Sequence, residues 1–157
     1  MRKFLILFLL VLSSFANANN RKGPTMTYPS RQITTSIERT PSEVYEFTAN
    51  PENMPKWAEG LSKSKMTKSG DYWIADSPMG SVKVKFTEKN KFGVLDHDVT
   101  LPNGDVIHNP FRVLKNGDGS EVIFTLYRLP KVSDADYEKD ASAVKADLLK
   151  LKSILEK

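Results

Sequence analysis

The sequence predicts an α+β fold, in which a curved antiparallel sheet of about seven strands wraps around a long C-terminal helix and two short helices follow the first strand. Three observations lead to this prediction. Residues 61–128 alternate between apolar and polar side chains with the period of two that strands show. A helix-capping sequence stands at residues 40–43, and an apolar stripe with helical spacing runs through residues 137–155. Successive antiparallel strands with helices grouped apart indicate α+β architecture.

Residues 1–18 have the layout of a secretory signal peptide. Arg2 and Lys3 form a short basic start, Phe4 to Leu12 is an unbroken apolar run, and Ala16-Asn17-Ala18 has the small residues of a cleavage site. The apolar run is too short to span a membrane, which takes ~20 residues. We therefore expect cleavage after Ala18, export to the periplasm or the medium, and no transmembrane segment in the mature chain.

Residues 19–30 are polar and contain two prolines, so we expect a flexible leader before a single domain over residues 31–157. The full chain has 23 Lys and Arg against 19 Asp and Glu. Loss of Arg2 and Lys3 with the signal peptide would leave 21 basic and 19 acidic residues, a net charge of +2. A charge this close to zero argues against a nucleic-acid partner. The chain has no cysteine, which excludes disulfides and cysteine metal sites.

The domain is expected to begin with a strand over residues 31–38, where apolar and polar side chains alternate. Thr40 and Glu43 form a capping box with proline at the first helical position, which predicts a helix that ends before Asn50. A second short helix is expected over residues 54–58, anchored by Trp57.

Period-two alternation predicts six further strands. Their ranges are residues 63–68, 72–76, 81–87, 94–101, 106–114 and 121–128. Asn103-Gly104 is a strong turn signal, so the fourth and fifth of these strands should form a hairpin.

The chain closes with a long helix. Ser133 is its expected N-cap, with Asp136 completing a capping box. Apolar side chains then recur at spacings of three and four, which predicts a face that packs on the domain's own sheet. These side chains are Tyr137, Ala141, Val144, Leu148, Leu151 and Leu155.

The segment SIERTPSEVYEFTANPENMPKW, Ser36 to Trp57, resembles the N-terminal signature of the SRPBCC superfamily. This helix-grip group includes polyketide cyclase/dehydrase-like proteins, START lipid-transfer domains and the birch-pollen allergen. The matching residues are Pro41, Glu43, Val44, Phe47, Asn50, Pro51 and Trp57. The resemblance extends, through the order of elements, over residues 31–157. It implies a cavity between sheet and long helix that binds a hydrophobic small molecule such as a lipid or polyketide. It transfers no catalytic residue and implies no cofactor.

The only two histidines of the chain lie in the predicted hairpin. With Asn103-Gly104 as the turn, the expected pairs are Leu101 with Val106, Val99 with His108, His97 with Pro110, and Leu95 with Arg112. Paired residues point to the same side of a sheet, so both histidines should share one face.

The opposite face of this hairpin would carry Asp96 and Asp98. Carboxylates are costly to bury without a partner, so the histidine face is expected to be the concave one. Pro110 cannot donate to the strand ladder and is typical of a bulge, which leaves the direction of Arg112 open.

The residues expected to contact a ligand are His97, His108, Arg112, Trp57, Val99 and Leu148. Two other interpretations of the histidines stay open: rim positions that satisfy local hydrogen bonds, and metal binding or acid–base catalysis. Two histidines are too few for a zinc site, so no metal is expected. Phe86, Phe111 and Phe124 are expected in the core.

The leading functional hypothesis is an exported protein that binds a hydrophobic small molecule. A second is a cyclase, dehydratase or hydrolase that uses His97 or His108 as the acid or base. A third is a cell-envelope interaction module without a ligand. A carboxylate converging on a histidine in the cavity would favour catalysis, whereas an apolar lining would favour binding.

Overall fold

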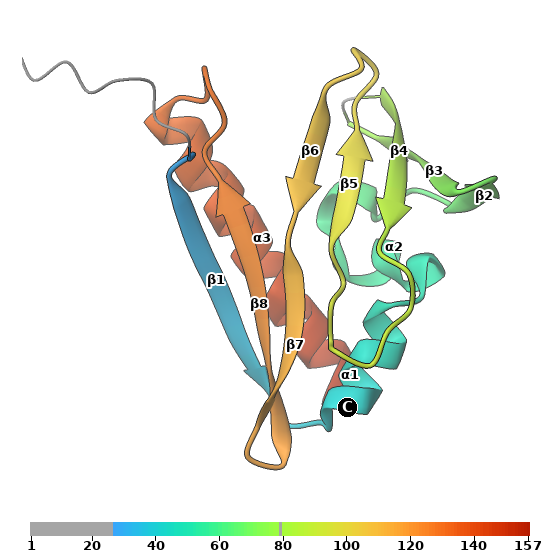
Figure 1. Ribbon diagram of the computed structural model, residues 1–157, viewed down its shortest axis with the longest axis vertical. Coiled ribbons are helices and arrows are strands. Elements are labelled where there is room, and N and C mark those ends of the chain that lie inside the picture. Colours follow the sequence, from blue (N-terminus) through green and yellow to red (C-terminus); the bar gives the residue numbers. More distant parts are fainter. Residues whose placement is uncertain (1–26, 79) are drawn as a thin grey trace, which may run out of the picture.

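Figure 1 shows the computed structural model, which describes residues 27–78 and 80–157. The predicted signal peptide and most of the predicted leader lie outside these residues. The elements are β1 (Ser30–Ile37), α1 (Pro41–Thr48), η1 (Pro51–Asn53), α2 (Met54–Trp57), η2 (Glu59–Leu61), β2 (Thr67–Ser69), β3 (Tyr72–Ser77), β4 (Gly80–Phe86), β5 (His97–Thr100), β6 (Val106–Asn109), β7 (Phe111–Asn116), β8 (Gly119–Tyr127) and α3 (Asp134–Leu155). The α+β prediction is confirmed.

The strands form two antiparallel sheets, of order β1-β8-β7 and β2-β3-β4-β5-β6. The single strand expected over residues 106–114 is divided at Pro110 into β6 and β7. Proline has no N–H for a ladder, which is the physical reason for a break at this position. In Figure 1, the three-stranded sheet lies in front of α3 and the β4–β6 arm stands beside it.

Both predicted N-caps are present. The Thr40 hydroxyl accepts a hydrogen bond from the Glu43 amide at 3.4 Å, and the Glu43 carboxylate accepts one from the Thr40 amide at 2.9 Å. The Ser133 hydroxyl accepts from the Asp136 amide at 3.1 Å. These bonds satisfy amides that have no partner within the helix, so the local sequence determines where α1 and α3 begin.

The predicted stripe of α3 faces the core. Tyr137, Ala141, Leu148 and Leu151 are buried, and Val144 and Leu155 are half-buried against the same cluster. The helix contacts β1, β8 and α2. Within the described part of the chain, no helix combines the length and apolar character needed to cross a bilayer.

The predicted register of the hairpin is wrong by one residue. Val99 pairs with Ile107 instead of His108, and His97 pairs with Asn109 instead of Pro110. The loop has three residues, because the Leu101 amide donates to the Asp105 carbonyl at 2.8 Å and the Gly104 amide donates to the Leu101 carbonyl at 2.9 Å. A shift of one residue turns every side chain of one strand to the other face.

Candidate functional site

His97 lies on the inner face of β5 and is only 5% exposed. Its ring nitrogen Nδ1 is 3.2 Å from the Leu95 carbonyl oxygen. Because a carbonyl only accepts, we assign the ring proton to Nδ1, and Nε2 then carries a lone pair. Burial lowers the pKa of His97 below its usual value, although the bond to Leu95 acts in the opposite direction. The ring is therefore neutral at neutral pH.

Five rings form a continuous line through the interior, which we call the aromatic row: Trp57, Phe111, Phe124, His97 and Phe86. The distances between successive ring centroids along this line are 6.0, 6.1, 6.5 and 5.5 Å. Its members come from α2, β7, β8, β5 and β4, so both sheets contribute. Trp57 and Phe111 are buried, whereas Phe86 and Phe124 are only half-buried.

Trp57 ends the row with an unpaired donor. The indole Nε1–H is buried and has no hydrogen-bond partner among the described residues. Buried indole N–H groups usually find an acceptor, and leaving a buried donor unpaired costs about 1–3 kcal/mol. The row therefore carries a free donor at Trp57 and, near its other end, an acceptor at His97 Nε2 with no partner among residues 27–78 and 80–157.

Two further predicted ligand contacts lie in the same interior. Val99 is half-buried on β5, two positions after His97 and therefore on the same face. Leu148 of α3 is almost completely buried in the core. The structure brings these residues into one core with Trp57 and His97, while their predicted role in binding stays a prediction.

His108 and Arg112 do not face the interior: the predicted placement of His108 is wrong, and the direction of Arg112, which the sequence left open, is outward. His108 pairs with Asp98 across the two strands, and its Nδ1 lies 2.6 Å from the Asp98 carboxylate in an exposed hydrogen bond. The Arg112 guanidinium pairs with Asp96, which also accepts a hydrogen bond from the Phe111 amide at 2.8 Å. The cause is the one-residue shift of register. Relative to β5, each side chain of β6 and β7 points to the face opposite to the predicted one.

Because of this shift, the sequence did not predict that Phe111 and His97 share a face. The predicted register placed Phe111 on the face opposite His97, whereas the observed one places them on the same face. The signal that could have revealed this is Pro102, which cannot donate in a ladder and therefore belongs to the turn. Among the described residues, no group of three or more His, Asp or Glu side chains is placed to hold a metal ion.

A family described as "Polyketide cyclase / dehydrase and lipid transport" matches residues 30–156, nearly the whole described chain. The chain belongs to this family. The SRPBCC resemblance drawn from Ser36 to Trp57 is thereby confirmed. A comparison of this polyketide cyclase / dehydrase family member with curated proteins gave no match.

Solved structures support the fold of this family member. An uncharacterised protein from Bacillus thuringiensis has a TM-score of 0.64 at 15% identity, over 81% of this chain and 98% of that one. DynU16, from the dynemicin biosynthetic locus, has a TM-score of 0.63 at 11% identity, over 81% of this chain and 47% of that one. Ara h 8.0201 has a TM-score of 0.60 at 8% identity, over 81% of this chain and 97% of that one. At these identities the likeness concerns the fold alone.

Proposed function

We propose that this protein binds a small hydrophobic molecule, of the lipid or polyketide kind, along the aromatic row. The observation that carries the proposal is the buried Trp57 Nε1–H without an acceptor. A ligand carbonyl or ether oxygen at this point would remove the cost of the unpaired donor. The membership of the family supports the same class of ligand.

The rest of the row supports an apolar ligand with polar ends. Phe86, Phe124 and Val99 are half-buried, so they retain apolar surface that a ligand would cover. Covering it contributes ~25 cal/mol per Å² before the costs of association. Because the His97 ring is neutral, its free Nε2 accepts rather than donates, and it suits a ligand hydroxyl. The expected ligand therefore has an apolar body, a carbonyl or ether oxygen, and a hydroxyl.

The catalytic hypothesis receives less support from this arrangement. A histidine that acts as a base is usually oriented by a carboxylate. The partner of the His97 Nδ1 is the Leu95 backbone carbonyl, and the histidine that does contact a carboxylate, His108, lies on the outer face. We therefore favour binding over cyclase, dehydratase or hydrolase chemistry.

Calorimetry with paired ligands tests the proposal. A long-chain or polycyclic ketone should bind at micromolar strength, and Trp57→Phe should weaken it about tenfold, the equivalent of one hydrogen bond. The hydrocarbon without the oxygen should bind both proteins alike. Trp73→Phe, which also removes one indole, serves as the matched control and should retain ketone binding. Equal ketone affinity of Trp57→Phe and wild type would remove the basis for the proposal.

We also propose that the protein is exported and that its mature form begins at Asn19. The support is the basic start, apolar run and small-residue cleavage site of residues 1–18. Intact mass spectrometry of the protein from the exported fraction of its host tests this. A mass that still includes residues 1–18 in that fraction would contradict it.

A further inference from the structure

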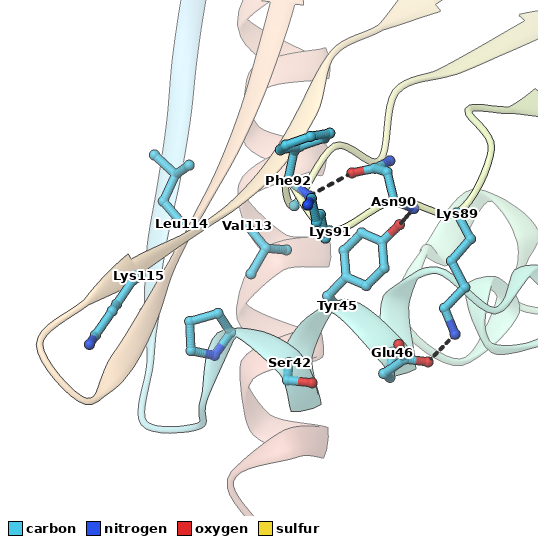
Figure 2. A pocket seen from close by; sticks show the side chains of 12 residues that line it. Ser42, Tyr45, Glu46, Lys89, Asn90, Lys91, Phe92, Val113, Leu114 and Lys115 are labelled. Carbon is cyan, nitrogen blue, oxygen red and sulfur yellow. Dashed lines mark hydrogen bonds and ion pairs between the residues drawn. The ribbon is translucent and has the colours of Figure 1, made fainter.

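A cleft of about 820 Å³ opens on the outside of the fold, between α1, the loop after β4 and the second half of β7. Figure 2 shows Tyr45 and Glu46 of α1 on one side, the loop residues from Lys89 to Phe92 above them, and Val113 to Lys115 beside them. This cleft is separate from the aromatic row, since the two share no residue.

Asn90 holds the loop in one shape. Its side-chain oxygen accepts from the amides of Phe92 at 3.0 Å and Val94 at 3.2 Å, and its side-chain nitrogen donates to the carbonyls of Glu88 and Val94, both at 2.9 Å. Its amide donates to the Tyr45 hydroxyl at 2.8 Å, which ties the loop to α1 (Figure 2). These hydrogen bonds fix the loop backbone on both sides of Phe92.

At the other end of the loop, Gly93 contacts the backbone of β7. The Val113 amide donates to the Gly93 carbonyl at 2.9 Å, and Gly93 has a φ of +70°. A Cβ at this position would overlap the Val113 carbonyl oxygen, so only glycine allows the loop to approach β7 this closely.

This hydrogen-bonded loop presents an apolar side chain to solvent. Phe92 is 71% exposed, and Leu114 beside the cleft is 44% exposed. Three lysines and one glutamate line the cleft, a net charge of +2. Lys89 is paired with Glu46 at 2.5 Å, which leaves Lys91 and Lys115 without an acidic partner among the lining residues. Lys91 lies beside Phe92, with its Nζ 5.7 Å from the ring centroid.

We propose that this face, formed by Phe92, Leu114 and Lys91, docks on an anionic phospholipid bilayer. Exposed apolar side chains next to lysines combine insertion below the headgroups with attraction to negative lipid charge. Positive charge favours an anionic partner, and an exposed aromatic side chain next to lysine is typical of segments that lie in the membrane interface. The inference stands apart from the ligand proposal, since it uses none of the residues of the row.

The absence of cysteine allows a site-specific test in the full chain. Leu114→Cys and Leu149→Cys are each labelled with an environment-sensitive fluorophore; Leu149 is similarly exposed but belongs to α3. With vesicles of equal parts phosphatidylcholine and phosphatidylglycerol, the label at 114 should shift to the blue and the label at 149 should not. Residues 1–18 are common to both variants, so any contact that they make affects both alike.

Second-site variants in the Leu114→Cys background identify the groups responsible. Phe92→Ser should weaken vesicle affinity about tenfold, the value expected for losing one inserted aromatic ring. Lys91→Glu and high salt should each weaken it as well, because both act on the electrostatic attraction. Unchanged thermal melting of Phe92→Ser would show that the loss is not one of folding, since the ring is exposed.

Three results would overturn the proposal: no shift at 114, an equal shift at 149, or equal binding to vesicles of phosphatidylcholine alone. A Phe92-dependent dimer in sedimentation without vesicles would instead assign the face to a second copy of the chain. Because calorimetry with Trp57 variants reports on the interior, failure of either proposal leaves the other intact.

Discussion

His97 and His108 lie on neighbouring antiparallel strands yet point to opposite faces of the sheet. The pairs His97–Asn109 and Asp98–His108 require this, since paired residues share a face and successive residues alternate. His97 is enclosed between the rings of Phe86 and Phe124, whereas His108 is exposed beside Asp98. Substitutions at the two histidines therefore test opposite faces of the same hairpin.

The buried His97 should make stability depend on pH. The unfolded chain takes up a proton at this residue below pH ~6.5, while burial lowers the pKa in the folded chain. The folded state should therefore lose stability as pH falls from about 6.5 towards the lower pKa, by at most ~1.4 kcal/mol per pH unit. His97→Phe should remove this component of the slope. Urea unfolding of both proteins across this range measures it; parallel pH profiles would show that His97 is not the group responsible.

His108→Ala should have a small effect, because both side chains of its contact with Asp98 are exposed. Exposed pairs contribute about 0–1 kcal/mol, so the free energy of unfolding should change by less than about 1 kcal/mol. Ligand affinity in calorimetry should be that of wild type. Loss of ligand binding in this variant would show that His108 contributes to the binding site.

Leu148→Asp should unfold the domain or nearly so. Leu148 is 1% exposed, and an unpaired buried charge costs about 3–5 kcal/mol, a large part of a typical domain's stability. Leu149→Asp, the adjacent and exposed position of the same helix, should stay within about 0.5 kcal/mol of wild type. Thermal unfolding compares them directly. Lys150 is a poorer control, since it pairs with Glu59. Similar losses in both variants would mean that the packed face of α3 is assigned wrongly.

Gly93→Ala should destabilise the protein more than Gly117→Ala. Both glycines have positive φ, so each change costs about 1–3 kcal/mol in backbone strain. Only at Gly93 would the new methyl group meet backbone, at the Val113 carbonyl, which adds about 1–3 kcal/mol; at Gly117 nothing lies within 4 Å. Chemical denaturation of the two variants gives the difference. Equal costs would show that the loop moves away from β7 without penalty.

The elements that were predicted correctly depend on short stretches of sequence. The capping box of Thr40 and Glu43 and the apolar stripe of α3 need only the neighbouring residues and the helical period, and both are present in the fold. The alternation within β5, β6 and β7 was also correct strand by strand. What failed was the register between β5 and β6, which depends on whether Pro102 lies in the ladder or in the turn.

The candidate site could be predicted only in part, because it depends on how distant segments approach one another. Trp57 and His97 were singled out by residue type and by position in their elements. Their connection through Phe111 and Phe124 requires α2 to pack beside β7, and β7 beside β8. No local pattern contains this information, and none shows that the Trp57 N–H is unpaired.

The pairing of β1 with β8 also determines when the chain can fold. Ser30 pairs with Tyr127 and Ile37 with Ser120, so the first strand acquires β8, its one sheet neighbour among the described residues, near the end of synthesis. The helix α3, which packs on β1, comes later still. Contacts between such distant segments form slowly, because the loop between them must close first. A chain emerging from the ribosome therefore carries β1 as an unpaired segment until almost all of the domain has been made.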